Sequence, residues 1–335
     1  MSNISLLDIA LKVGVSKTTV SMVLNGRGKE YGISDRVIKK VRETAKQLNY
    51  KPNKLARSLR TGSTKMIGVI VLDLANRFHS RLSRSIEDCA AEHGYRVMVC
   101  SSDEKDTKLA GLVDELIDNR VEGLIFAPTE KAKEKVMELK RDQFPFVLVD
   151  RTFSRITTDY VGSDNFKASY DAVNHMASKG YTKIGIIAFS PNLVHMKDRL
   201  AGYRKALHDH NIRIDNRLIR KISYENIEAQ VLIHVNELVR EENIRAILFT
   251  TNRMSIIGLK ALYDMKIRIP QDIAVITYDD NEFFPMMQPS ITAIAQPIDE
   301  IGKRAVELLV SRLNNGRVGF EQIKLETQLI KRDSC

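Results

Sequence analysis

Residues 5–25 read SLLDIALKVGVSKTTVSMVLN, and this pattern predicts two short helices joined by a tight turn. Apolar residues recur at three- and four-residue spacing in both halves of the stretch. Gly14 interrupts the pattern between the halves, and Ser16 is suited to cap the second helix. Such a pattern is typical of a helix-turn-helix.

The second predicted helix has Lys17, Thr18, Ser21 and Met22 on its outward face. When a helix-turn-helix binds DNA, exposed residues near the start of its second helix contact base edges in the major groove. An ordinary helical hairpin at the start of an enzyme is the alternative, and the pattern alone favours DNA binding only modestly.

The distribution of charge distinguishes these two interpretations. Residues 1–62 hold 13 Lys and Arg against 4 Asp and Glu, whereas the whole chain holds 52 against 42. The remaining 273 residues therefore carry 39 against 38 and are close to neutral. A strongly positive N-terminal part joined to a neutral body is expected when that part neutralises DNA phosphates.

The composition predicts a globular protein. With 335 residues, of which 43% are hydrophobic, the chain is expected to form more than one domain. No signal peptide is recognisable and no apolar run approaches ~18 residues, so we expect neither export nor membrane insertion, and a cytoplasmic location. Because Cys89, Cys100 and Cys335 lack the spacing of metal ligands, we expect reduced thiols and no metal site.

A third helix and a short basic segment follow the helix-turn-helix. Ser34 is suited to cap a helix ending near Leu48, which predicts a three-helix headpiece over residues 1–48. In residues 49–62, Pro52 stops that helix and Asn53 can start a further segment, which is too short to be stable alone. We expect this hinge helix to order against DNA and a partner copy, with a plain linker as the alternative.

From Lys65 onward, apolar runs alternate with amphipathic stretches. This alternation predicts two similar α/β subdomains with parallel sheets and helices on both faces, in which ligands bind at the carboxyl ends of strands. The strand candidates are 66–72, 96–100, 123–127, 146–149, 183–189, 219–222, 246–250 and 273–277, and the helix candidates are 78–93, 106–119, 130–140, 166–179, 197–210, 225–241 and 254–265.

Several motifs agree in order and spacing with one known family. They are Val15-Ser16 to Asn25, Tyr50-Lys51-Pro52-Asn53 with Ala56-Arg57-Ser58-Leu59, Ile67-Gly68-Val69-Ile70-Val71, Val121-Glu122-Gly123-Leu124-Ile125, Asp150-Arg151, Val161-Gly162-Ser163-Asp164-Asn165, Arg199-Leu200-Ala201-Gly202-Tyr203, Tyr278-Asp279-Asp280 and Pro289-Ser290-Ile291-Thr292. On these motifs the chain resembles the LacI family of bacterial transcription regulators over essentially its whole length.

The resemblance implies a homodimer on a pseudo-palindromic operator in double-stranded DNA. It also implies a periplasmic-binding-protein-like core over residues 63–335 that closes over a small effector. The chain would cross between the core subdomains near 163, 292 and 322. The N-subdomain would then comprise 63–162 and 293–322, and the C-subdomain 163–292 and 323–335.

The resemblance also implies DNA-binding residues. Met22 departs from the family, in which many members carry arginine, and a methionine cannot form arginine's bidentate contact with guanine. We therefore expect an operator that differs at that base pair. The implied base-reading residues are Lys17, Thr18 and Met22, the implied backbone contacts are Ser5, Ser16, Thr19, Ser21 and Asn25, and the implied hinge residues are Asn53, Ala56, Arg57 and Leu59, the last inserted into the minor groove.

The implied effector residues suit a hydroxylated or charged molecule such as a sugar or sugar derivative. Arg77 and Arg253 stand where the family often has proline and aspartate, which favours an anionic effector unless both arginines point to solvent. The implied effector contacts are Phe78, Arg151, Asp164, Arg199, Tyr224, Asn252 and Asp279.

Other functions remain to be weighed against a DNA-binding repressor. A sugar-binding protein or an α/β enzyme acting without DNA are the alternatives, but no phosphate loop, nucleophile elbow, paired metal histidines or cofactor motif is present. The sequence leaves open whether an effector releases the protein from DNA or recruits it, and whether it represses or activates. The chain also lacks a leucine-rich tail, so we expect a dimer.

Overall fold

The structure is a computed structural model that describes residues 4–50, 63–190, 194–316 and 319–335. The chain divides into two compact units, Met1–Thr64 and Lys65–Cys335. The first unit contains the headpiece, and the second is the core.

The described part of the headpiece contains α1 (Leu6–Val13), α2 (Lys17–Leu24) and α3 (Asp35–Gln47). Ser5 and Asp8 begin α1 with a capping box, and Gly14 ends it in the left-handed region, where glycine is not strained. The predicted helix-turn-helix and the third helix are confirmed. The buried residues between these helices include Ile9, Val20, Val23, Ile38 and Val41.

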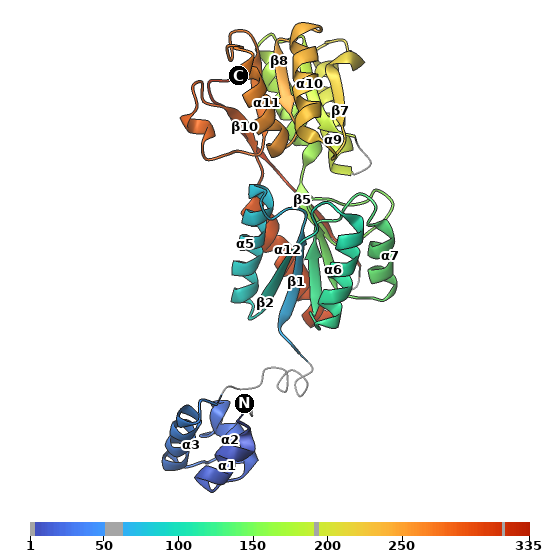
Figure 1. Cartoon of the computed structure of the whole chain (residues 1–335). Coiled ribbons are helices and arrows are strands. Elements are labelled where there is room, and N and C mark those ends of the chain that lie inside the picture. The colour runs from blue at the N-terminus through green and yellow to red at the C-terminus, as the bar shows by residue number, and fades with distance from the viewer. Residues whose placement is uncertain (1–3, 51–62, 191–193, 317–318) are drawn as a thin grey trace. The chain divides into compact units, whose positions relative to one another are not determined.

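Among the described residues the core contains two six-stranded sheets (Figure 1). Neighbouring strands pair in parallel except β10 and β12, which pair antiparallel. The first sheet has the order β11 (Gln322–Leu325), β5 (Tyr160–Ser163), β4 (Phe146–Val149), β3 (Gly123–Phe126), β1 (Met66–Val71) and β2 (Arg96–Ser101). The second has β12 (Gln328–Ile330), β10 (Thr292–Ala295), β9 (Ala274–Tyr278), β8 (Ala246–Phe249), β6 (Ile184–Phe189) and β7 (Ile219–Ile222).

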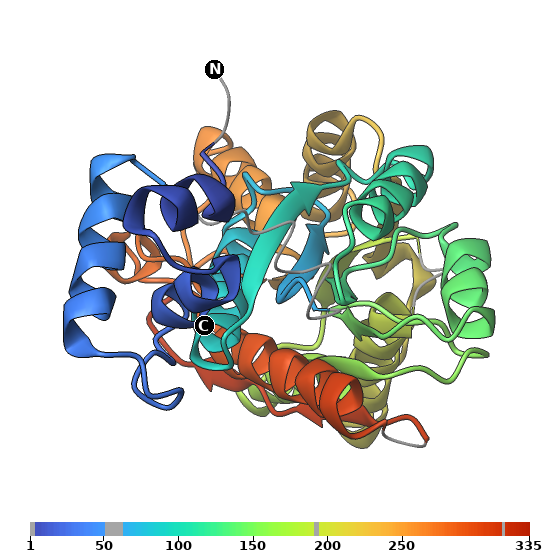
Figure 2. The ribbon, with the colours of Figure 1, turned by 90° about the horizontal axis from the view of Figure 1, so that it is seen from below.

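Helices cover both faces of each sheet, because consecutive strand residues point to opposite faces. In the first sheet, Val69 packs on the side of α5 and α12, and Ile70 packs on the side of α6 and α7. In the second sheet, Ile247 and Leu248 likewise pack on opposite faces. Figures 1 and 2 show α12, in red, along the first sheet. The helices are α5 (Arg77–Glu92), α6 (Asp106–Asp118), α7 (Lys133–Arg141), α8 (Asn165–Ser178), α9 (Val194–Asp209), α10 (Ile227–Arg240), α11 (Asn252–Asp264) and α12 (Ile298–Asn315), with short 3₁₀ turns η1 (Asn216–Leu218) and η2 (Phe284–Met286).

The chain passes from one sheet to the other between 163 and 165, between 295 and 298, and between 325 and 328. The first passage agrees with the expected position. The expected passages near 292 and 322 are wrong by a few residues, because β10 still pairs in the second sheet and β11 still pairs in the first. The eight predicted strands and seven predicted helices each correspond to an observed element, whereas β5, β10, β11, β12 and α12 have no counterpart among the predicted ranges.

No helix in the described part of the chain combines the length and apolar character needed to span a membrane.

The contact between α8 and α9 generates a stability prediction. A Cβ on Gly202 of α9 would lie 2.2 Å from the backbone oxygen of Phe166 in α8, so Gly202→Ala should force the helices apart. We expect a loss of about 1–3 kcal/mol in the free energy of unfolding, measured by urea denaturation.

The matched control is Gly111→Ala in α6, where a Cβ meets nothing within 4 Å among the described residues. It should raise the free energy of unfolding by roughly 0.5–1 kcal/mol, because alanine favours helix more than glycine does. Equal effects of the two substitutions would contradict the close approach of α8 and α9.

Candidate functional site

The first turn of α2 leaves two side chains free at the headpiece surface. Lys17 and Thr18 are exposed, whereas Ser16 and Thr19 engage each other. The Thr19 backbone N–H donates to Ser16 Oγ at 3.0 Å, and the two hydroxyl oxygens lie 2.8 Å apart. Met22, on the next turn, is half-buried. These positions suit base contacts from Lys17 and Thr18, with Met22 beside them.

The other predicted DNA-binding residues of the headpiece lie at helix ends. Ser5 caps α1 and accepts from the Asp8 backbone, and Asn25 Nδ2 donates to Ser21 O at 2.7 Å just beyond α2. Both are exposed, while Ser21 is half-buried. The predicted hinge residues Asn53, Ala56, Arg57 and Leu59 lie outside the described residues.

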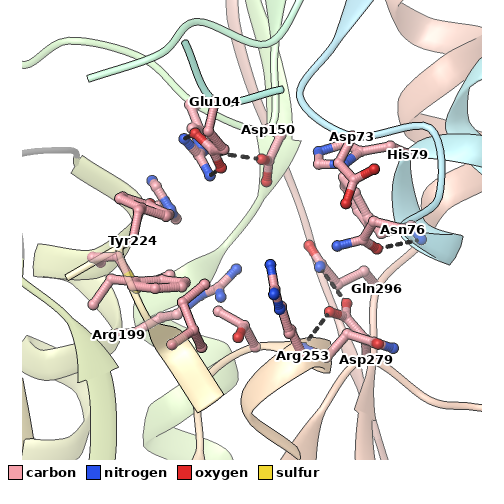
Figure 3. Close-up of a pocket in the computed structure, with 18 of the residues that line it drawn as sticks. Asp73, Asn76, His79, Glu104, Asp150, Arg199, Tyr224, Arg253, Asp279 and Gln296 are labelled. Atoms are coloured by element: carbon pink, nitrogen blue, oxygen red, sulfur yellow. Dashed lines mark hydrogen bonds and ion pairs between the residues drawn. The ribbon is translucent and has the colours of Figure 1, made fainter. Parts of the chain in front are cut away.

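In the core, a cavity of about 380 Å³ lies between the two subdomains, where strands of both sheets end (Figure 3). Most of its polar residues lie in loops that follow strands, and Asn252 and Arg253 lie in the first turn of α11. The polar residues after strands of the first sheet are Asp73, Asp103, Glu104, Asp150 and Arg151, and those after strands of the second sheet are Thr251, Asn252, Arg253, Asp279 and Gln296. The cavity therefore has the position expected for a ligand site in parallel sheets.

Six of the seven predicted effector residues line this cavity. The exception is Asp164, whose carboxylate accepts from the backbone N–H of Lys167 at 2.9 Å and caps α8 instead. Because Asp164 begins a helix directly after the first passage between sheets, its side chain serves that helix and is not among those that line the cavity. The six that do are Phe78, Arg151, Arg199, Tyr224, Asn252 and Asp279.

Arg151 is held on the N-subdomain side of the cavity. It is buried, and its Nη1 and Nη2 donate to the two carboxylate oxygens of Glu104 at 2.9 and 2.6 Å. Its guanidinium lies 5.3 Å from the ring centre of Tyr224, which belongs to the other subdomain. This bidentate pair fixes the orientation of Arg151 and neutralises its charge.

Arg199 and Asp279 are held on the C-subdomain side. Arg199 Nε donates to Asn165 Oδ1 at 2.8 Å, Nη1 donates to Thr250 O at 2.5 Å, and the guanidinium stacks on Tyr278. Burial raises the pKa of Asp279, although Gln296 Nε2 donates to Oδ1 at 2.6 Å. Both groups therefore enter the cavity in fixed positions.

Several cavity residues do not follow from the sequence pattern. His79 and His195 are buried inside helices that are otherwise read as packing elements, and Glu104 and Gln296 belong to loops without a motif. Among the described residues, His195 Nδ1 has no hydrogen-bond partner. A polar residue near the start of a helix that follows a strand is the sequence signal that could have identified the two histidines as cavity residues.

The two unusual arginines have different surroundings. Arg77 Nη2 pairs with Glu282 Oε1 at 2.5 Å, and Arg77 does not line the cavity. Arg253, near the start of α11, extends into it (Figure 3). Of the two arginines that were expected near the ligand, Arg253 lines the cavity and Arg77 does not.

The cavity shows no arrangement of metal ligands. In the described residues no three His, Cys, Asp or Glu side chains are grouped to hold a metal ion.

The buried histidines generate a pH prediction. Burial lowers the pKa of His79 and, together with Arg151 and Arg199, places the pKa of His195 well below its usual value. The folded protein therefore takes up protons on both side chains less readily than the unfolded chain, which does so below about pH 6.5. Stability should therefore fall as the pH decreases from 7 to 5, by at most about 1.4 kcal/mol per pH unit for each histidine.

His195→Gln should remove one of these contributions. Urea denaturation at pH 7 and pH 5 should show a smaller difference between the two pH values for the variant than for the wild type. An unchanged difference would mean that His195 takes up its proton as readily in the folded as in the unfolded state.

Comparison with known proteins agrees with these features. The family model "Bacterial regulatory proteins, lacI family" matches residues 5–53, and "Periplasmic binding protein-like domain" matches 173–335. The HTH-type transcriptional regulator KdgR of Bacillus subtilis is 30% identical over 98% of this chain and 96% of its own length. The ribose operon repressor of Escherichia coli is 30% identical over 98% of both chains.

Solved structures give the same result. The Lac repressor dimer bound to operator and the anti-inducer ONPF is 25% identical, with a TM-score of 0.86 over 99% of both chains. The chain therefore belongs to the LacI family and is a DNA-binding transcription regulator.

Proposed function

We propose that this regulator is a repressor that binds a pseudo-palindromic operator as a homodimer in the cytoplasm. In this proposal a small-molecule effector, a sugar or sugar derivative, binds in the core cavity and changes operator affinity. The observation that carries the proposal is the cavity itself, which lies between two subdomains of a core joined to a helix-turn-helix.

Support for DNA binding comes from the headpiece. Residues 1–62 carry a net charge of +9, from 13 Lys and Arg against 4 Asp and Glu, and the exposed first turn of α2 is not occupied by internal contacts of Lys17 or Thr18 among the described residues. The Lac repressor, which matches nearly the whole chain, is described as a dimer on its operator. Two copies of one headpiece on DNA require a site with matching half-sites.

Support for an effector comes from the size and lining of the cavity. About 380 Å³ lies in the range of small-molecule sites. Hydroxyl groups can donate to Asp150 and Asp279 and accept from Asn252, while Phe78 and Tyr224 offer apolar surface to a sugar ring. Arg151 and Arg199, which were also predicted as effector contacts, line the same cavity.

A chain of hydrogen bonds connects the cavity with two of the passages between subdomains. Gln296, just after β10, donates from Nε2 to Asp279 Oδ1 and accepts at Oε1 from Ser163 Oγ at 2.7 Å. Ser163 ends β5 immediately before the first passage. A ligand that contacts Asp279 would therefore act on residues at which the subdomains turn relative to each other.

An effector changes operator affinity only if it binds one arrangement of the core better than another. The connection through Gln296 is compatible with either a decrease or an increase in operator affinity when the effector binds. Release from the operator by an inducer and recruitment by a corepressor both use the same contacts.

Selection of binding sites from random DNA tests the DNA-binding part. We expect a pseudo-palindromic consensus whose base at the Met22 contact is not the guanine that an arginine would read, since methionine offers only apolar contact. Met22→Arg should shift the selected base at that position toward guanine. Selection of no consensus would contradict the proposal, and an unchanged base in the variant would contradict the role of Met22.

Ser163→Ala tests the connection between cavity and passages. It removes the hydroxyl that donates to Gln296 but does not alter a side chain of the cavity lining. Operator binding is measured by fluorescence anisotropy with and without the neutral sugars D-glucose and D-galactose and the sugar acids D-glucuronate and D-galacturonate. We expect near wild-type affinity for DNA and ligand, with the ligand-induced change in operator affinity reduced about threefold to tenfold, as for loss of one hydrogen bond.

The matched control is Ser83→Ala, which removes another buried serine hydroxyl that donates within α5 to His79 O. It should retain the full ligand effect. Equal loss in both variants would show that Ser163 has no specific part in coupling.

A further inference from the structure

The carboxylates that line the cavity already have partners inside the protein. Glu104 is engaged by Arg151, and Asp103 Oδ2 accepts from Lys108 Nζ at 2.6 Å. The two oxygens of Asp279 accept from Gln296 and from the Asn252 backbone N–H. Asp73 Oδ1 accepts from the Ala75 backbone N–H at 2.9 Å, and Asp150 Oδ2 lies 3.6 Å from Arg151 Nε. Each carboxylate of the lining therefore has at least one partner inside the protein.

The positively charged side chains of the lining have fewer charged partners inside the protein. The Arg253 side chain has no hydrogen bond or ion pair with any residue in the described ranges, and it is exposed and lines the cavity. Arg199 is held by two neutral oxygens, those of Asn165 and Thr250, and no carboxylate in the described part of the chain forms an ion pair with it. Both arginines belong to the C-subdomain, and each retains its full charge.

Two buried nitrogens in the lining also lack partners. Within the described residues, neither Arg151 Nε nor His195 Nδ1 forms a hydrogen bond. Arg151 Nε is 3.6 Å from Asp150 Oδ2, which is an ion pair but too long for a good hydrogen bond. Because both atoms are buried, a ligand in the cavity would not contact them directly, and an exposed side chain such as that of Arg253 is a donor that it can reach.

Arg253 is therefore a cationic group of the lining whose side chain has no partner within the described residues, whereas each lining carboxylate has at least one. We propose that the ligand of the cavity is a hydroxylated organic anion, that is a sugar derivative with a carboxylate or phosphate group, and that Arg253 binds the anionic group. The proposal rests on the proposed function, since it assigns the chemical class of the effector in the same cavity.

The position of Arg253 suits this role better than that of the other arginines. Arg151 is neutralised by Glu104, and Arg77 is engaged by Glu282 outside the cavity. Arg253 lies in the first turn of α11, whose N-terminal backbone groups add favourable partial charge for an anion. Figure 3 shows its side chain extending toward the centre of the cavity.

The test is isothermal titration of the full-length protein with pairs of compounds that differ in charge. The pairs are D-glucose with D-glucuronate, D-galactose with D-galacturonate, and D-glucose with D-gluconate and D-glucose 6-phosphate. We expect an acidic member to bind at least about tenfold more tightly than its neutral partner, which corresponds to about 1.4 kcal/mol. The carboxylate and phosphate members distinguish the two sources of negative charge.

Arg253→Gln should abolish most of this preference without unfolding the protein, because the side chain is exposed. The matched control is Lys260→Gln, which removes a positive charge from an exposed position on the same helix but outside the cavity lining. It should retain the preference. Tighter binding of a neutral member, or a preference that survives Arg253→Gln, overturns the proposal.

A second measurement applies even when no sugar in the panel binds. Inorganic phosphate and sulfate at tens of millimolar should raise the melting temperature of the core in the wild type and in Lys260→Gln, but less in Arg253→Gln. If no sugar binds and the three proteins respond equally to these anions, the proposal is wrong. Operator binding in the same preparations reports separately on the proposed function, which stands if a neutral sugar alters operator affinity.

Discussion

The chain passes between the two sheets of the core three times, and this constraint determines which residues meet in the cavity. Strands of both sheets end at the boundary that the passages cross, so the loops after β1, β2 and β4 face those after β8, β9 and β10. Neither subdomain alone forms the cavity. A molecule that fills it contacts both subdomains, and such contact is the physical requirement for coupling binding to their arrangement.

Two aspartates occupy equivalent places in the two halves of the cavity. Asp150 follows β4 with φ 62°, and Asp279 follows β9 with φ 68°. A left-handed residue directly after a strand reverses the chain sharply, and aspartate tolerates this conformation better than most residues do. Each subdomain thus uses the same local device to present a carboxylate to the cavity, although their hydrogen-bond partners differ.

Apolar runs predicted β1, β3, β4, β6, β8 and β9, which are buried on both faces, but they did not predict β5 and β10, which are interior strands as well. β11 and β12 are half-exposed edge strands of four and three residues, and their pairing depends on contacts distant in sequence. Their ends therefore could not be located from local pattern, and the second and third passages were misplaced accordingly. α12 follows β10 without a predicted strand to mark its start.

The residues of the site also divide into those that the sequence predicted and those that it did not. Residues in family motifs, such as Arg199 and Asp279, could be predicted, and they line the cavity. Asp164 belongs to a motif as well, but helix capping determines where its carboxylate lies. The burial of His195 and the unequal surroundings of Arg77 and Arg253 result from packing between distant segments, on which a single sequence carries no information.

The side-chain amide of Gln296 has one end that only donates and one that only accepts. Its nitrogen faces the Asp279 carboxylate and its oxygen faces the Ser163 hydroxyl. A half-turn of the amide would bring its oxygen against the Asp279 carboxyl group, so an ionised Asp279 favours the orientation observed. Ionisation of a single carboxylate in the cavity thus favours one orientation of a side chain at the junction of the two subdomains.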